Sequence, residues 1–169
     1  MKAQVMEPKE VAELMPQILN LQKILVPIDF SDTSKKALHY ALRFAEQFNC
    51  EIVLLHVVEA VSPTVGSPLV LEVFLDAEDP LSIAEKKLAA LSAQSRTNGT
   101  NSASSTIRTG HAPNEINKAA KDLDIDLIII ATHGYTSWRH LCIGSTAERV
   151  VRSAPCSVLV VREKEHEFV

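Results

Sequence analysis

Short apolar segments alternate with amphipathic segments along most of this chain, and that alternation constrains the fold more than any other feature. Four of the short segments are apolar and rich in β-branched residues, as are strands buried on both faces of a parallel sheet. A fifth, 104–108, is a weaker candidate. We therefore expect strands at 24–28, 51–58, 104–108, 126–131 and 157–162.

Helix signals fill the intervals between these strands. Ser31 precedes the first helix, and Asp79-Pro80 is typical of a helix start, with Asp as the cap and Pro in the first turn. A third helix opens at 110–113, and the last is expected from about Ser145 to Ser153. The polar stretch 94–105 predicts a loop between the second helix and the third strand.

Apolar residues at three- and four-residue steps mark the inner faces of these helices. In the first and second helices, the expected inward residues are Ala37, Leu38, Ala41, Leu42, Ala45, Phe48, Leu81, Ala84, Leu88 and Leu91. In the third and fourth, they are Ile116, Ala119, Ala120, Leu123, Ala147, Val150 and Val151.

The resulting order, β-α-β-α-β-α-β-α-β, predicts a doubly wound α/β domain with a parallel sheet and helices on both faces. We place this domain at 23–162, between an N-terminal extension at 1–22 and a charged tail at 163–169. In such sheets a ligand binds outside the carboxyl ends of the strands, where the strand order reverses. If the first strand is central, Asp29 at its end faces 131–134 across that crevice.

Composition limits the class of protein. The chain has 46% hydrophobic and 22% charged residues, which is typical of a globular domain. Its net charge of −4 argues against a dedicated nucleic-acid-binding protein. The first 20 residues lack the apolar core of a secretory signal, and no apolar run is long enough to span a membrane. Three scattered cysteines are typical of reduced thiols, so we expect a cytoplasmic protein without a membrane partner.

Two of the five glycines lie where a polyphosphate can be held. Gly134 follows the fourth strand, and Gly144 with Ser145 opens the last helix after nine intervening residues. A helix N-terminus presents free N–H groups and the positive end of the helix dipole. The spacing predicts a phosphate site between the two turns, with the Ser145 hydroxyl as a further donor.

The segment ATHGYTSWRHLCIGSTAERVVRSAPCSVLVVR resembles the carboxyl third of the universal stress protein family. That family's nucleotide signature is Gly, two residues, Gly, nine residues, and then Gly-Ser or Gly-Thr. KILVPIDFSDTSKKAL is similar to the family's first strand and helix, and EIVLLHVVE to its second strand. The resemblance extends over about 22–162 and implies a five-stranded sheet of order 3-2-1-4-5 that binds ATP with Mg²⁺.

By position, the resemblance implies two groups of ligand contacts. Those expected beside the adenine and ribose are Pro27, Ile28, Asp29, Val57, Ile130 and Ala131. Those expected around the phosphates are Gly134, Gly144, Ser145 and Thr146. Ala131 departs from the signature, which has Gly there, and its methyl group is harmless only if φ is negative. The resemblance also implies a homodimer through 157–161, an otherwise exposed apolar edge.

Structural roles for some of these residues stay open. Asp29 can cap the following helix, and Ser145 with Glu148 matches the S-x-x-E capping box, which would occupy the Ser145 hydroxyl. The group His133, His140 and Cys142 matches no common metal-ligand spacing, so we assign no metal site.

These observations favour an adenine-nucleotide-binding stress-response or signalling protein that acts as a ligand-dependent switch on an unknown protein partner. A nucleotide-free dimeric interaction module is the alternative, motivated by Ala131 and the apolar segment 69–75 within the long connection 59–79. A slow ATPase is a further alternative. We assign no catalytic residue, because no general base is recognisable beside the phosphate turns. The P-loop, the G-x-G-x-x-G fingerprint and the G-x-S-x-G elbow are absent from the sequence.

Overall fold

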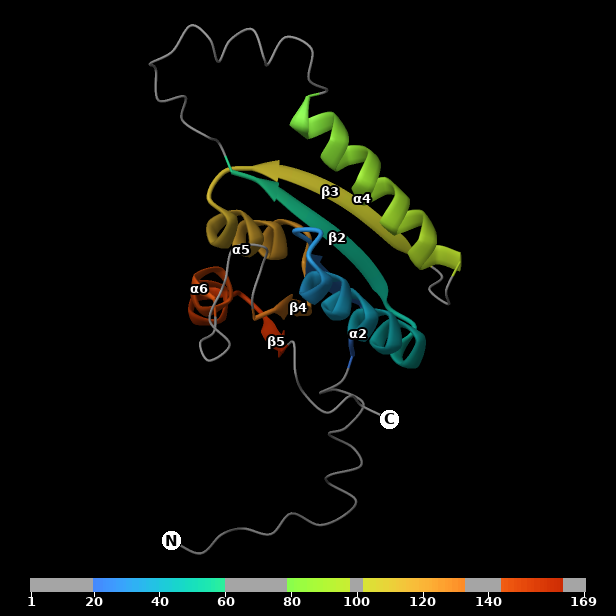
Figure 1. Cartoon of the computed structure of the whole chain (residues 1–169). Helices are drawn as coiled ribbons and strands as arrows, with labels where there is room; N and C mark the ends of the chain where they lie inside the picture. Colours follow the sequence, from blue (N-terminus) through green and yellow to red (C-terminus); the bar gives the residue numbers. More distant parts are fainter. Residues whose placement is uncertain (1–19, 60–78, 98–101, 133–143, 163–169) are drawn as a thin grey trace, which may run out of the picture.

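The computed structural model describes residues 20–59, 79–97, 102–132 and 144–162. In this part of the chain, five parallel strands form one sheet that is covered by helices on both faces (Figure 1). The elements, in chain order, are β1 (Lys23–Pro27), α2 (Asp32–Phe48), β2 (Glu51–Val58), α4 (Pro80–Thr97), β3 (Ala103–Thr109), α5 (Ala112–Asp122), β4 (Leu127–Ala131), α6 (Ser145–Ser153) and β5 (Ser157–Val161).

The sheet has the order β3-β2-β1-β4-β5, which confirms the predicted doubly wound α/β fold. β1 lies at its centre and pairs with β2 on one side and β4 on the other. The chain therefore first builds the sheet outward from β1 in one direction and then returns to extend it in the other. The point where the order reverses lies between β1 and β4, which is where a doubly wound sheet leaves a crevice.

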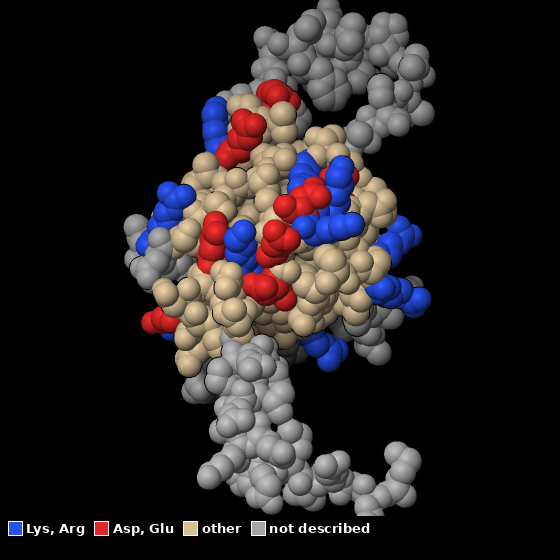
Figure 2. Space-filling view, turned by 180° about the vertical axis from the view of Figure 1, so that it is seen from behind, with Lys and Arg blue, Asp and Glu red and all other residues tan. Residues whose placement is uncertain are grey.

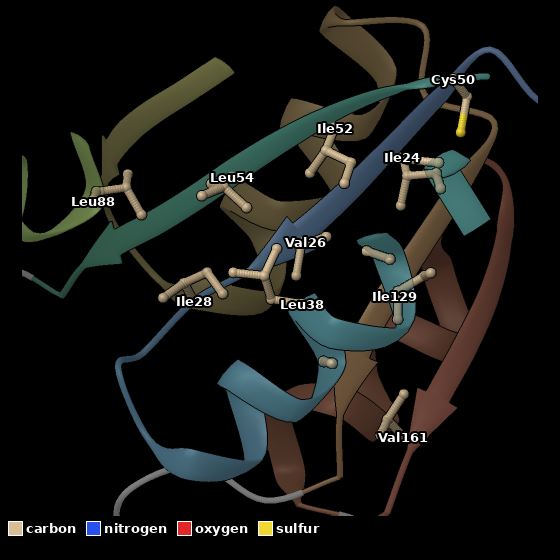
Figure 3. Close-up of a cluster of buried hydrophobic side chains, with 13 residues drawn as sticks. Ile24, Val26, Ile28, Leu38, Cys50, Ile52, Leu54, Leu88, Ile129 and Val161 are labelled. Atoms are coloured by element: carbon tan, nitrogen blue, oxygen red, sulfur yellow. The ribbon is translucent and has the colours of Figure 1, made fainter. Parts of the chain in front are cut away.

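Two apolar clusters hold the helices to the sheet. On one face, α2 and α4 contribute Leu38 and Leu88 to a cluster with buried side chains of the central strands, such as Val26 and Leu54 (Figure 3). On the other face, α5 and α6 contribute Ile116 and Val150, among others. Burying each large aliphatic side chain stabilises the fold by about 1.5–3 kcal/mol, so both helical layers are needed to cover a sheet of this kind.

Helix α2 illustrates how local sequence sets an element's ends. The Ser31 hydroxyl accepts a hydrogen bond from the Ser34 N–H (3.2 Å) and caps the N-terminus. At the other end, Asn49 adopts the left-handed conformation (φ 52°, ψ 46°), and its N–H donates to the Ala45 carbonyl. Asn tolerates this conformation better than most residues, so the helix ends at Phe48 and β2 follows after Cys50.

The predicted loop at 94–105 is wrong at both ends. Helix α4 continues to Thr97, and β3 already begins at Ala103. Two side chains of α4 hold the start of β3, because the Ser92 hydroxyl and Arg96 Nε both donate to the Ala103 carbonyl (3.1 and 2.8 Å). These hydrogen bonds between α4 and β3 extend both elements into a stretch whose polar composition is typical of a loop.

Two residues predicted to face inward lie at the surface. Leu81 of α4 is 38% exposed and Val151 of α6 is 48% exposed. The neighbours that do face inward, Ala84, Leu88, Ala147 and Val150, are buried. Within the described part, no helix is long and apolar enough to cross a bilayer. The molecular face seen from behind carries acidic and basic side chains close together (Figure 2).

Candidate functional site

A cavity of about 310 Å³ opens at the carboxyl ends of β1, β2 and β4, beside the N-terminus of α6. Its position is the one that the strand order predicts, and its size falls in the range of small-ligand sites. It brings together nine of the ten predicted site residues: Pro27, Ile28, Asp29, Val57, Ile130, Ala131, Gly144, Ser145 and Thr146. The tenth, Gly134, lies outside the described residues.

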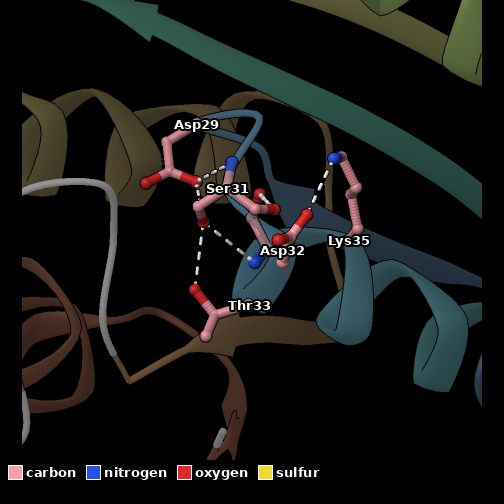
Figure 4. A network of polar contacts seen from close by, with 6 residues as sticks. Asp29, Ser31, Asp32, Thr33 and Lys35 are labelled. Carbon is pink, nitrogen blue, oxygen red and sulfur yellow. Dashed lines mark hydrogen bonds and ion pairs between the residues drawn. The ribbon is translucent and has the colours of Figure 1, made fainter.

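The carboxylate of Asp29 lies at the wall formed by the end of β1 (Figure 4). Its Oδ1 accepts hydrogen bonds from the Ser31 N–H (3.0 Å) and the Ser31 hydroxyl (2.5 Å). Ser31, not Asp29, caps α2 by accepting from the Ser34 N–H. Asp29 therefore fixes the capping residue without being the cap, and its other carboxylate oxygen points away from Ser31 (Figure 4).

The N-terminus of α6 forms the opposite wall. Gly144 is the N-cap (φ −60°, ψ 149°), and its N–H donates to the Thr132 carbonyl (2.7 Å), which ties the helix start to the end of β4. As a glycine, Gly144 has no side chain with which to cap this helix. The first N–H groups of a helix have no partner within the helix, so this end of the cavity suits an anion.

The capping box that the sequence left open for Ser145 and Glu148 does not form. Ser145 is the first residue of α6, one position too late to be the N-cap, which is Gly144. Glu148 instead forms an ion pair with Arg152 one turn later (2.7 Å). The Ser145 hydroxyl consequently has no capping role that would compete with a ligand.

Ala131 introduces no backbone strain. It is the last residue of β4 and pairs with Val161 of β5. The described non-glycine residues with positive φ are Phe30, Asn49 and Asp124, so Ala131 is not in the region that favours glycine. The methyl group at this position therefore adds side-chain volume to the cavity wall and leaves the strand conformation unchanged.

Sequence reasoning missed several residues of the cavity wall, among them Ser34, Glu59 and Ala112, whereas Thr132 lies in the range 131–134 that was expected at the crevice. Glu59 directly follows β2, and its Oε1 accepts a hydrogen bond from the Ala112 N–H (3.3 Å) at the start of α5. The rule that placed Asp29 at the carboxyl edge of the sheet applies equally to Glu59 and Thr132. Ser34 and Ala112 belong to helix starts, and only the strand order brings them to the same edge.

The charges around the cavity limit its chemistry. Asp29 and Glu59 line it, and no Lys or Arg does so among the described residues. A phosphate group would therefore meet backbone N–H groups and the dipole of α6, with a bound cation to balance charge. In the described part of the chain, no group of three or more His, Cys, Asp or Glu side chains lies close enough to hold a metal ion by itself. The group His133, His140 and Cys142 falls outside it.

Comparison with known proteins gives one family throughout. The profile of the universal stress protein family matches residues 20–162. Universal stress protein MJ0531 of Methanocaldococcus jannaschii is 33% identical over 153 residues, which cover 86% of this chain and 85% of the relative. The solved structure of universal stress protein UspA from Lactobacillus plantarum is 30% identical, covers 85% of this chain and 99% of that one, and has a TM-score of 0.70.

Two more distant structures of the same fold contain nucleotides. One is a universal stress protein in complex with cAMP, at 19% identity and a TM-score of 0.62, which covers 84% of this chain and 97% of that one. The other is a universal stress protein from Archaeoglobus fulgidus in complex with dAMP, at 18% identity and a TM-score of 0.59, which covers 85% of this chain and 99% of that one.

Proposed function

Because the chain belongs to the universal stress protein family, we propose that it binds ATP with Mg²⁺ at the carboxyl edge of its sheet and acts as a ligand-dependent switch. The observation that carries this proposal is the cavity itself, which joins the end of β1 to the start of α6. Two structures of the same fold contain adenine nucleotides, cAMP and dAMP. We further propose that the protein acts in the cytoplasm during stress signalling.

In this proposal the base and the phosphates occupy opposite walls. The adenine lies against Pro27 and Ile28 with its edge toward Asp29 and Val57, while Ile130 and Ala131 line the ribose. The phosphates meet Gly144, Ser145, Thr146 and Gly134. Backbone N–H groups and a hydroxyl at a helix start provide donors without a cationic side chain, and Mg²⁺ provides the positive charge that the described wall lacks.

Replacing Gly144 with Asp tests the phosphate wall. Asp is a better N-cap residue than Gly, and Gly144 has a negative φ that Asp adopts without strain. The variant should therefore unfold at the same temperature or slightly above. Its carboxylate would lie beside the phosphates, so ATP affinity should fall at least tenfold, roughly 1.4 kcal/mol or more. A loss of affinity without a loss of stability separates the site from the scaffold.

The measurement is isothermal titration calorimetry with Mg-ATP, after mass spectrometry of nucleotide that copurifies with the protein. Ala93→Asp is the matched control, because Ala93 is exposed on α4 and does not line the cavity. Equal ATP affinity in wild type and Gly144→Asp would contradict the assignment of this wall. If the wild type carries no nucleotide and binds none, the nucleotide-free interaction module replaces this proposal.

Turnover decides the remaining alternative. A slow ATPase would release phosphate from Mg-ATP above the buffer background, and Gly144→Asp would abolish that release together with binding. We propose no hydrolytic role: Asp29 and Glu59, the acidic residues of the described wall, each accept a hydrogen bond from a backbone N–H next to a helix start, and we assign no residue to activate a water molecule.

A further inference from the structure

The side chain of His56 donates a hydrogen bond to a backbone carbonyl that, in a regular sheet, would accept from a neighbouring backbone N–H. His56 lies near the end of β2, and its Nδ1 is 2.7 Å from the Ile28 carbonyl oxygen, just beyond β1. A carbonyl oxygen only accepts, so Nδ1 carries the proton and donates. This bond sets the tautomer of the imidazole ring.

The register of β1 and β2 shows what the imidazole replaces. The Ile28 N–H donates to the Leu55 carbonyl (2.8 Å), which continues the pairing one residue beyond Pro27. In a regular parallel ladder, the Ile28 carbonyl would next accept from the Val57 N–H. In the described part of the chain, this carbonyl accepts from the imidazole of His56 instead.

The alternation of backbone hydrogen bonds along β2 shows that the N–H and C=O groups of Val57 point toward the end of β1. The Ile52 N–H donates to Ser102, and the Val58 carbonyl accepts from Gly110, so the even-numbered backbone groups of β2 face β3. Backbone groups of successive strand residues point to opposite neighbours. Those of Val57 therefore point toward β1, whose last residue is Pro27, and Val57 lines the cavity at that place.

His56 also holds the turn that follows Asp29. Phe30 has a positive φ (67°), a conformation that is strained for a bulky residue. Its ring packs against the imidazole of His56 at 4.7 Å between centroids, and Lys87 Nζ of α4 lies 5.6 Å from the same ring centroid. The contacts on the Phe30 ring thus help keep Asp29 at the cavity wall.

We propose that His56 is a positioning residue, whose Nδ1–H occupies the Ile28 carbonyl and so reserves the Val57 N–H for the edge of a nucleobase. This role rests on the nucleotide binding proposed above. The backbone N–H and C=O of one residue form a donor and acceptor pair that matches the edge of adenine. His56 leaves that pair available, because its side chain and not the Val57 N–H bonds to the Ile28 carbonyl, where the pairing of β1 with β2 ends.

Two amide variants distinguish hydrogen bonding from packing. The side-chain nitrogen of Asn can take the place of Nδ1, whereas Gln is closer to His in size but places its nitrogen one bond further out. His56→Asn should bind ATP within about threefold of wild type, and His56→Gln and His56→Leu at least tenfold more weakly. A residue that only filled space would give the reverse order of Asn and Gln. His39→Leu, at an exposed position on α2, is the control for loss of a histidine.

Amide hydrogen exchange measured by NMR tests the same role without a variant. In the wild type, the Val57 amide should exchange quickly in the free protein and become protected by Mg-ATP, while the Leu55 amide, within the ladder, stays protected throughout. Protection of Val57 in the free protein would overturn the inference, and so would equal ATP affinity in all three His56 variants. In both cases wild-type ATP binding survives. If wild type binds no nucleotide, the proposed function fails first and the role of His56 fails with it.

Discussion

Two cysteine thiols lie at the amino ends of strands, at the edge of the sheet away from the cavity. Cys50 precedes β2 and is buried, and Cys156 precedes β5 and is partly buried. Burial raises the pKa of both thiols, and the negative charge of Asp126 raises the pKa of each further. Both are therefore neutral at pH 7 and poor nucleophiles.

The raised pKa values predict a pH dependence of stability. A thiol whose pKa is higher in the folded state contributes to the free energy of unfolding. This contribution is fully present below the pKa of the unfolded state, near 8.5, and is lost as pH rises through the pKa of the folded state. Wild type should therefore lose more unfolding free energy than Cys50→Ala/Cys156→Ala between pH 7.5 and 9.5. Urea titrations at both pH values measure this. Parallel pH profiles of the two proteins would contradict it.

Single residues show where sequence information is enough and where it is not. The position of Asp29 followed from a strand end, and the structure places it at the cavity wall. That its Oδ1 anchors Ser31 depends on local geometry that residue types do not specify. The bond from His56 to Ile28 joins residues 28 positions apart. Strand pairing creates that contact, so no local pattern signals it.

At the scale of elements, the start of α2 links stability to the cavity. Ser31→Ala removes the cap and should lower the free energy of unfolding by about 1 kcal/mol. It also removes the hydroxyl that donates to Asp29, so ATP affinity should fall as well. Asp32→Ala is the control, because Asp32 is almost fully exposed and forms an ion pair with Lys35 at 2.9 Å, which contributes little. Thermal unfolding and calorimetry measure the two effects. An unchanged ATP affinity in Ser31→Ala would show that the capping residue does not support ligand binding through Asp29.

The elements were predictable where the apolar period was strong. The strands β2 and β4 and the inner face of α5 follow from patterns of Ile, Val, Leu and Ala. The end of α4 was not predictable, because Ser92 and Arg96 are polar residues that a loop would also contain. Similarly, Ser145 carries a capping signature, but Gly144 takes the N-cap because its N–H is held by Thr132.

At the scale of the whole molecule, we expect a homodimer through β5. Among the described strands, β5 pairs with β4 alone and lies at the edge of the sheet, where apolar strands usually find a partner. Val160→Lys should convert the dimer to a monomer, because it places a charge at the half-buried edge. Val151→Lys, on the exposed side of α6, is the control. Sedimentation velocity measures both. A monomeric wild type at working concentration, or a Val160→Lys dimer, would count against this interface.

Most of the cavity wall comes from four separate stretches of chain, within 27–29, 55–59, 130–132 and 144–147, and residues of α2 and α5 complete it. No one of them forms the wall alone, so the cavity exists only while the sheet is assembled. A ligand held there stabilises the folded state as a whole, by about 2.7 kcal/mol at a hundred times its dissociation constant. If that ligand is ATP, as proposed, its concentration would influence how long each molecule survives proteolysis, and the abundance of the protein would then follow the energy state of the cell.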